Sequence, residues 1–382
     1  MVRPTVSIVE GMKIEERVAE AVRLVGGMSR VVGRGDKVLV KPNLVDGAPA
    51  ETGETTHPEA LRELTELAFE AGAAEVSVGE SEPYEGRRAA LYEKIRALVK
   101  PLGAIVVNFN DEPFDTVKVP EPVHFSEVKI ARAVTRCDVF INAPTLKTHG
   151  LVGVTAAIKN YYGVIPREDK IRYHKSDRVE EAIVDLYQAR PSDLVVVDGT
   201  YSTIHWGPRE DFPETHRLDL ALAGTDPVAV DTVSAKVIGV EPKTLRYLRW
   251  AEERGLGVAD LDSIRVVGAP VNAGRKATTT TVEYNNRRCR HIKILDFASC
   301  TGCHGRVSAH VFAFQDGEMK EDATIVVGPE ARQPTGGGKV ILVGRCAAPT
   351  FFNRLKGTYI PGCPPNLSRL DSLLEELGAK KR

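Results

Sequence analysis

The sequence predicts an α/β protein: a large domain with a mostly parallel sheet and crossover helices, followed by a small C-terminal α+β domain that bears cysteines. Two observations support this prediction. Strand-like and helix-like segments alternate through most of the chain, and five of the six cysteines fall at or after residue 289. Alternation of strand, helix and strand implies parallel pairing through crossover helices. The expected domains are residues 1–274 and 275–382.

Each element of the large domain follows from hydrophobic periodicity and from turn residues at its ends. β-Branched apolar runs are typical of strands, and an apolar face repeating every three or four residues is typical of a helix. The expected strands are 5–10, 37–41, 75–81, 104–109, one within 137–147, 193–199 and 218–224. The expected helices are 13–28, 58–71, 89–99, 179–189 and one that begins near 227.

Two of these helices carry start signals. Thr56 and Glu59 match a capping box. Thr225 or Asp226 is suited to cap the last helix, with Pro227 just inside it.

The composition of the chain changes after about residue 275, where polar and β-branched residues replace the alternation of strand-like and helix-like segments. A glycine turn at 336–338 precedes an expected strand at 339–344, and residues 366–378 form an amphipathic helix. These elements predict a smaller domain with its own core.

Composition excludes several classes of protein. The formal net charge of −1 gives no basis for binding a nucleic-acid backbone or an anionic membrane. No apolar run approaches the length of a membrane span, and the first residues lack a signal-peptide pattern. We therefore expect a cytoplasmic protein, in whose reducing environment thiols bind metal or stay free more often than they form disulfides.

The stretch SCTGCHG, residues 299–305, places Cys300 and Cys303 where one turn of chain can present both to a metal. Cys346 and Cys363 form a second, distant pair, and Cys363 is followed by proline in IPGCPPN. Cysteine followed by proline also ends the bacterial ferredoxin run. The four cysteines predict a [4Fe-4S] cluster.

Other readings of the thiols remain open. The four cysteines suit a zinc site less well, because zinc sites usually bring both pairs at short spacing, and thiols without any metal are a third possibility. Cys289 is an alternative to Cys346 as the fourth ligand. Three thiol ligands would leave one iron open to act as a Lewis acid, whereas four favour an electron carrier or a structural role. Cys137, far from the others, is expected to be a buried apolar side chain.

Polar residues follow the predicted strands of the large domain, where ligands bind in open α/β sheets. We expect lysines in such settings to hold anionic groups or to act as bases. Standard nucleotide fingerprints and the GxSxG elbow are absent from the sequence. The catalytic candidates are Lys147, His149, Lys159 and Asp231, and the substrate-binding candidates are Lys41, Asn43, Glu80, Asn160, Asp198 and Asp226.

Several of these candidates also have structural interpretations. Asp231 interrupts the apolar run VAVDTVSA, so we expect a buried carboxylate that pairs with Lys147 or Lys159, in either a core salt bridge or a catalytic pair. Asp226 also suits a helix cap, and a lone loop histidine such as His149 is often structural.

Several phrases resemble a known family. VLVKPNLV, TTHPEAL, VGES, INAPTLKTHGLVGVTAAIKNYYGVIP, VVVDGT and LAGTDPVAVDTVSA occur in this order over roughly residues 35–240. They are similar to domain of unknown function 362, a family of uncharacterised iron–sulfur-centre proteins. The resemblance implies an α/β domain, a cytosolic location and an association with [4Fe-4S] clusters. The ten strand-end candidates lie within these phrases, but the tandem CxxCxxCxxxC ferredoxin module of many relatives is missing here.

Together these features predict a cytosolic iron–sulfur protein acting on an anionic small molecule, as an iron–sulfur-dependent oxidoreductase or lyase. One alternative is a non-catalytic electron-transfer protein that docks to a redox partner protein. Another is a zinc-stapled enzyme without redox function.

Overall fold

The computed structural model describes residues 3–44, 47–81, 89–176, 178–204, 215–273, 281–350 and 354–382. These fall into two compact units. The large unit lies within Met1–Thr148, Val154–Pro242 and Tyr247–Ala277, and the small unit within His149–Gly153, Lys243–Arg246 and Thr278–Arg382. The predicted boundary at 274–275 lies outside the described residues.

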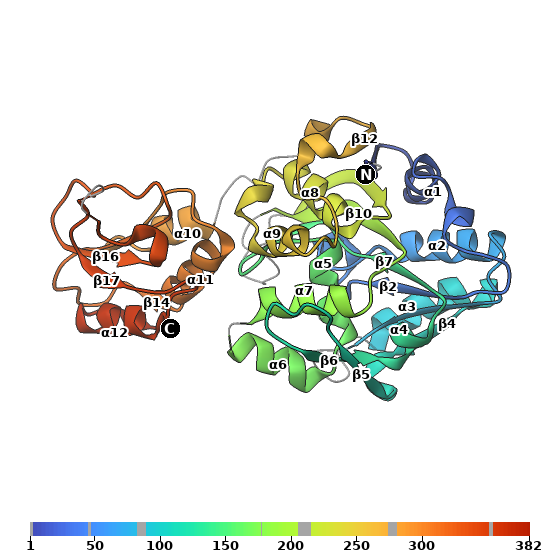
Figure 1. Ribbon diagram of the computed structural model, residues 1–382, viewed down its shortest axis with the longest axis horizontal. Coiled ribbons are helices and arrows are strands. Elements are labelled where there is room, and N and C mark those ends of the chain that lie inside the picture. The colour runs from blue at the N-terminus through green and yellow to red at the C-terminus, as the bar shows by residue number, and fades with distance from the viewer. Residues whose placement is uncertain are drawn as a thin grey trace. The chain divides into compact units, whose positions relative to one another are not determined.

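The large unit is built on an eight-stranded sheet with the order β12-β1-β11-β10-β7-β2-β3-β4 (Figure 1). Every strand of this sheet except β11 runs in the same direction, which confirms the predicted fold class. The strands are β1 (Thr5–Glu10), β2 (Lys37–Pro42), β3 (Glu75–Glu80), β4 (Ile105–Asn108), β7 (Val139–Ala143), β10 (Leu194–Thr203), β11 (Thr215–Gly224) and β12 (Arg265–Gly268).

Helices cover the sheet of the large unit. Side chains alternate across a strand, so Val38 and Val40 of β2 join the apolar core with α1, α2 and α3, whereas Lys41 turns to the other face, toward α5. The helices are α1 (Ile14–Leu24), α2 (Pro58–Glu70), α3 (Ala89–Val99), α4 (Arg132–Arg136), α5 (Ala157–Asn160), α6 (Arg167–Lys175), α7 (Val179–Ala189), α8 (Pro227–Val237) and α9 (Arg246–Glu253).

Two short hairpins and several 3-10 turns lie between these elements, and the last of the 3-10 turns belongs to the small unit. β5 (Phe114–Lys118) pairs with β6 (Glu127–Ala131), and β8 (Lys147–His149) pairs with β9 (Gly153–Thr155). The 3-10 turns are η1 (Met28–Arg30), η3 (Ala50–Thr52), η4 (Lys100–Leu102), η5 (Phe109–Asp111), η6 (Tyr161–Val164), η7 (Pro242–Thr244), η8 (Leu261–Ser263), η9 (Val271–Ala273) and η10 (Arg345–Ala347).

The start of α2 differs from the predicted capping box. His57 is the N-cap residue, and its Nδ1 accepts a hydrogen bond from the Glu59 backbone N–H at 3.2 Å. The Thr56 hydroxyl instead donates to the Ala143 carbonyl and accepts from the Asn43 N–H. Thr56 therefore joins two strand ends, a contact that local sequence spacing does not reveal.

The small unit has a four-stranded sheet, order β13-β15-β16-β17, that is parallel throughout. Its apolar core includes Val307 and Val311 of α11 and Leu370 and Leu374 of α12. The predicted turn at 299–305 is the start of α11, with Cys300 as its N-cap residue. The elements are α10 (Thr281–Arg288), β13 (Ile292–Asp296), α11 (Thr301–Phe312), β14 (Phe314–Gln315), β15 (Ala323–Val327), β16 (Lys339–Val343), β17 (Thr358–Ile360), α12 (Ser368–Glu376) and β18 (Lys380–Lys381).

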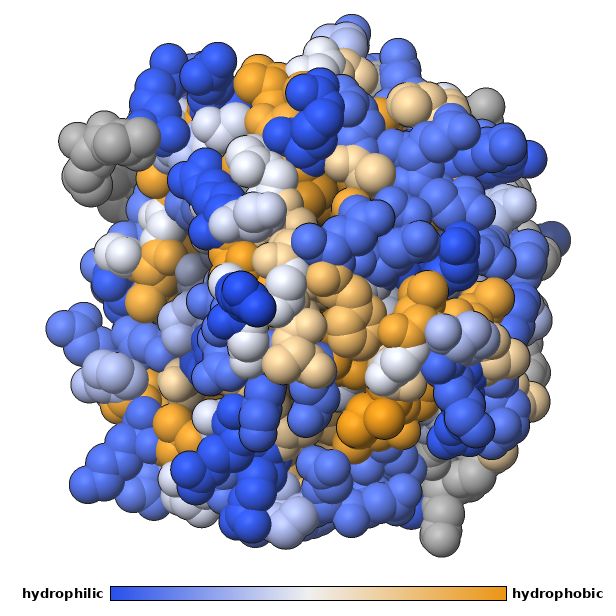
Figure 2. All heavy atoms as spheres, turned by 90° about the vertical axis from the view of Figure 1, so that its right-hand side faces the viewer, coloured by the Kyte–Doolittle hydropathy of each residue, from blue (hydrophilic) through white to orange (hydrophobic). Residues whose placement is uncertain are grey.

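Surface features match a protein with a polar exterior. Figure 2 shows one face on which hydrophilic residues predominate and apolar residues lie between them. Among the described residues, no helix is both long and apolar enough to cross a bilayer.

Candidate functional site

Three lysines gather on the α5 side of the large sheet. Lys41 is the penultimate residue of β2, Lys147 begins β8, and Lys159 lies in α5. Lys41 and Lys147 are fully buried, and Lys159 is half-buried. The charges of Lys41 and Lys147 act on Lys159, so the three ammonium groups share one environment.

The Lys41 ammonium is held by several acceptors. It donates to the Asn160 Oδ1 at 2.9 Å and to the Pro42 carbonyl at 2.6 Å, and it lies 3.5 Å from a Glu80 carboxylate oxygen. A side chain on Gly163 would collide with both Glu80 and Lys41, so only glycine leaves room for this ion pair. The pair therefore depends on close approach of the backbone.

Lys147 and Lys159 have different surroundings. The Lys147 ammonium donates to the Glu54 carbonyl at 2.9 Å. The Lys159 ammonium lies 4.5 Å from the centroid of the Tyr162 ring. In the described part of the chain, Lys159 has neither a hydrogen-bond acceptor nor a carboxylate partner. Of the carboxylates described here, Glu80 is the one that acts on Lys159, and it opposes the effect of the two other lysines on the Lys159 pKa.

Burial and the neighbouring charges of the cluster shift the pKa of Lys159. Burial, together with the charges of Lys147 and Lys41, lowers the pKa of Lys159 to about 7, against the opposing effect of Glu80. A large fraction of the Lys159 side chains therefore carries a neutral amine near pH 7. A neutral amine is a base or a nucleophile, whereas an ammonium group is neither.

Amide side chains fix α5 against the sheet. The Asn160 Nδ2 donates to the Asn142 Oδ1 at 2.7 Å, and the Asn142 Nδ2 donates to the Ala157 carbonyl at 2.8 Å. Because Lys159 lies between Ala157 and Asn160 in the chain, these hydrogen bonds fix the position of the Lys159 backbone. Asn160 thus serves as a positioning residue for two lysines.

Asp231, fully buried in α8, supports α5 from the other side. Its two oxygens accept hydrogen bonds from the Ala157 N–H at 2.5 Å and the Ile158 N–H at 3.1 Å. The prediction that Asp231 pairs with Lys147 or Lys159 is wrong, because its partners are backbone groups. Burial raises the pKa of Asp231 to about 7, although the two N–H donors favour the charged form.

Two further candidate carboxylates also bind backbone. Asp198 accepts from the His57 N–H at 2.7 Å and from the Thr200 N–H and hydroxyl. Asp226 caps α8 through the Val228 and Ala229 N–H groups and also accepts from the Val258 N–H at 3.0 Å. Their oxygens already hold these chain segments, so both residues have a structural role whether or not they touch a ligand.

Asn43 and His149 complete the predicted set. Asn43 follows β2, and its backbone exchanges hydrogen bonds with Thr56. His149 groups with the small unit, and its Nδ1 accepts from the Leu151 and Val152 N–H groups at 3.1 and 3.3 Å. This ring nitrogen closes the β8–β9 turn and is therefore not available as a base in this arrangement.

Four thiols gather in the small unit. Cys300 follows β13, Cys346 lies in η10 after β16, and Cys363 follows β17, so all three lie beyond the carboxyl ends of parallel strands. Burial raises the pKa of Cys303 to about 12, and Cys300, Cys346 and Cys363 each add to this shift electrostatically. The Cys303 Sγ also lies against Gly344, where a Cβ would approach it to 2.8 Å.

The remaining cysteines lie elsewhere. Cys289 is part of the apolar core of the small unit, and the groups acting on its pKa are charged side chains of other residue types. The charges of Cys300, Cys346 and Cys363 act on Cys303, and Cys289 is not among the described groups that act most strongly on it. Burial raises the pKa of Cys137 to about 11, so its thiol stays protonated at neutral pH, in keeping with an inert role.

Two residues near the thiols were missed by sequence reasoning. The buried Arg246 packs against Gly302, and its positive charge favours the Cys303 thiolate. Arg246 is far from the cysteines in the sequence, so no sequence pattern indicates this contact. His304 directly follows Cys303, which completes a C-x-x-C-H pattern of the kind used to attach haem. Its ring nitrogens lie 2.6 Å from Asp296 and 2.9 Å from the Thr281 hydroxyl, so the ring is already occupied.

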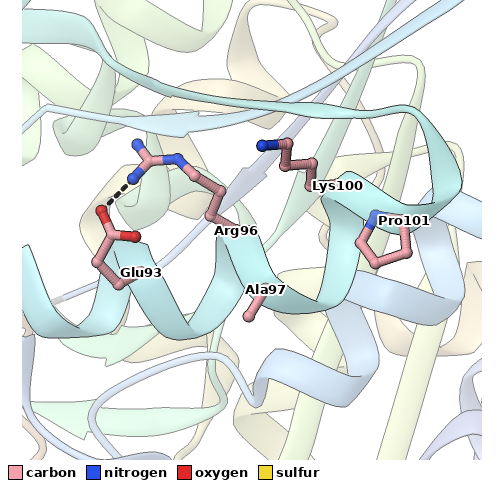
Figure 3. A pocket seen from close by; sticks show the side chains of 5 residues that line it. All are labelled: Glu93, Arg96, Ala97, Lys100 and Pro101. Atoms are coloured by element: carbon pink, nitrogen blue, oxygen red, sulfur yellow. Dashed lines mark hydrogen bonds and ion pairs between the residues drawn. The ribbon is translucent and has the colours of Figure 1, made fainter.

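Across the described ranges, no three His, Cys, Asp or Glu side chains lie together as ligands of a metal ion. A hollow of about 520 Å³ lies on α3 and η4, and Glu93 and Arg96 form an ion pair at its edge (Figure 3). Its open, charged lining offers no chemistry beyond that pair.

Comparison with known proteins gives a family, one relative in sequence and one solved structure. Residues 38–236, just over half of the 382-residue chain, match the family described as Domain of unknown function (DUF362). A thylakoid-associated protein of Synechocystis sp. is 28% identical over 237 residues, which cover 60% of this chain and 72% of that protein. The lactate racemase apoprotein of Thermoanaerobacterium thermosaccharolyticum has a TM-score of 0.42 and 11% identity, over 99% of this chain and 92% of that one.

Lys159→Met is expected to flatten the dependence of stability on pH above neutrality. An unfolded lysine titrates near ~10.4, whereas Lys159 titrates at about 7 in the folded chain. Between these values the unfolded chain binds one more proton, so the free energy of unfolding rises with pH by at most about 1.4 kcal/mol per unit from this group. Urea unfolding across this range, with exposed Lys100→Met as control, measures the slope. Equal slopes in native protein and Lys159→Met would show that the folded lysine titrates normally.

Asp231→Ala is expected to lower the free energy of unfolding by about 3 kcal/mol, since it leaves two buried N–H donors of α5 without acceptors. Asp231→Asn retains one acceptor oxygen, so its loss is expected to be smaller. Amide exchange should become faster at residues 157 and 158 in the alanine variant. Unchanged exchange there would contradict the anchoring role of Asp231.

Proposed function

The chain belongs to the family described as domain of unknown function 362, and we propose that it is an iron–sulfur protein whose large unit binds an anionic small molecule. The family match bears out the resemblance seen in the sequence and, with the fold, makes this an α/β protein of that family. The proposal rests on one main observation, the gathering of the buried Lys41 and Lys147 within electrostatic reach of the half-buried Lys159.

An anionic ligand is proposed because burying several positive charges close together costs free energy. An ammonium group without a counter-charge is strongly disfavoured in a protein interior, and a buried carboxylate or phosphate relieves that cost. Glu80 lies within ion-pair distance of Lys41. A ligand carboxylate or phosphate would be a suitable partner for Lys159, which is half-buried and lies beside the Tyr162 ring.

The thiols of Cys300, Cys303, Cys346 and Cys363 fit the donor set of a [4Fe-4S] cluster, which four cysteines hold. The effect of Cys300, Cys346 and Cys363 on the Cys303 pKa supports this assignment. Arg246 would offset part of the negative charge of the thiolates. Such a cluster supplies one-electron transfer or, with an open iron, Lewis acidity. Zinc remains the alternative for the same thiols, and a redox partner protein remains the alternative to a small-molecule substrate.

The proposed setting is a reducing, cytoplasmic one, because thiols committed to a cluster must escape disulfide formation. An oxidoreductase or a lyase is the reaction class that combines such a centre with an anion site. Among the residues predicted to be catalytic, Lys147 and Lys159 would act on the ligand through their charges or by contact. Asp231 would act indirectly, because it positions α5.

Phosphate and lactate are expected to stabilise the native protein, and Lys147→Met and Lys159→Met are expected to abolish most of that stabilisation. Binding to the folded state alone adds about 1.4 kcal/mol at ten times the dissociation constant. Thermal unfolding with each salt, against chloride at equal ionic strength, measures the effect, and Lys100→Met should respond like the native protein. An equal response from all variants would contradict an anion site at these lysines.

Cys346→Ser and Cys363→Ser are expected to lose iron and acid-labile sulfide, whereas Cys289→Ala is expected to keep both. The thiol of Cys289 lies in the apolar core, so its substitution should lower stability without removing a ligand. Metal and sulfide analysis of anaerobically purified chains decides this. Stoichiometric zinc without sulfide in the native protein would favour the zinc alternative, and iron loss on Cys289→Ala would contradict the assigned ligand set.

A further inference from the structure

The three lysines of the cluster divide into two kinds. The ammonium of Lys41 is fixed by Asn160, Pro42 and Glu80, and that of Lys147 by the Glu54 carbonyl. Both are buried and hold their charge in place. Lys159, in contrast, has the Tyr162 ring as its neighbour and no acceptor among the described residues.

The base of Lys159 is rigid although its tip is not held by an acceptor. Asp231 binds the N–H groups of Ala157 and Ile158, and Asn160 is bonded to Asn142. The Tyr162 hydroxyl is itself fixed by the Lys170 carbonyl at 2.6 Å, so the ring forms a firm wall beside the amine. A rigid backbone, one aromatic wall and a half-buried, unoccupied amine are what a reacting group requires.

We propose that Lys159 is a nucleophile that forms an imine with the carbonyl carbon of an anionic carbonyl compound, such as a 2-oxo acid, which the fixed positive charges of Lys41 and Lys147 attract. This inference rests on the proposed anion site and names its substrate class. Two lysines serve as fixed charges and the third as the reacting group, and each role follows from what its ammonium or amine contacts.

The step balances without an oxidant or a reductant. The neutral Lys159 amine attacks the carbonyl carbon, a C–N bond forms, and the carbonyl electron pair moves to oxygen. The C–O bond then breaks, and the oxygen leaves as water with the two hydrogens that the amine carried. The charges of Lys41 and Lys147, which favour the neutral amine before the reaction, also stabilise the negative charge that develops on oxygen.

Reductive trapping tests the inference. The full, anaerobically purified chain is incubated with pyruvate or with glycolaldehyde phosphate in the presence of cyanoborohydride, and the modified peptide is identified by mass spectrometry. Lactate, which has a carboxylate but no carbonyl, is the matched negative probe. The expected result is a single reduced adduct on Lys159, formed at a rate that rises with pH and levels off above a midpoint of about 7.

Two variants keep the outcomes distinct. Lys159→Arg retains a cation but no nucleophile, so it should bind lactate as measured by thermal unfolding and yield no adduct. Exposed Lys100→Arg should yield the same adduct as the native protein. If the native chain binds lactate and gives no Lys159 adduct with either probe, the imine is refuted and the anion site stands. If neither lactate nor phosphate binds, the proposed function itself fails. An adduct that persists in Lys159→Arg also refutes the inference.

Discussion

The gathering of Lys41, Lys147 and Lys159 near Glu80 is the constraint on which the described part of the large unit depends. A hydrophobic residue at any of these positions would avoid the desolvation cost of the charge, since buried charges are often replaceable by apolar side chains with a gain in stability. The chain instead supplies amide, carbonyl and carboxylate acceptors to Lys41 and a lowered pKa to Lys159. Such perturbed groups gather at functional sites. The cluster therefore has the features of a site maintained for binding or chemistry.

Buried carboxylates connect the elements that surround this cluster. Asp198 links β10 to the first turn of α2, Asp226 links α8 to the chain at Val258, and Asp231 links α8 to α5. Hydrogen bonds to an ionised carboxylate are stronger than those between neutral groups. All three acids supply acceptors to backbone N–H groups that would otherwise lack partners. Asp226 does so after β11, whose end lies beside the starts of β1 and β10. Asp231 contributes to the position of Lys159, because it holds the first turn of α5.

The sequence predicted most of the large sheet, because β-branched runs and capped amphipathic helices depend on local periodicity. Asp226 was recognised as a helix cap from its neighbours alone, and the burial of Asp231 followed from its apolar surroundings. The partners of Asp231 were not predictable, because α5 has four residues and is too short to show a periodic pattern. Likewise Arg246 reaches Gly302 through the tertiary fold, and no spacing rule connects them. Residue type and burial were thus accessible, whereas long-range pairing was not.

The two units place side chains of opposite charge type at equivalent positions in their sheets. Beyond the carboxyl ends of parallel strands, the large unit gathers amines and the small unit gathers thiols. The protonated thiol of Cys303, with a pKa of about 12, is the form that the protein alone favours, because neighbouring cysteines and burial both oppose a thiolate. A cationic centre reverses this preference and releases protons as it binds. An anion does the converse for the lysines, since it favours the ammonium form. Burial therefore disfavours the charged forms of Lys159 and Cys303, and under the proposed function a ligand of opposite charge would stabilise each cluster.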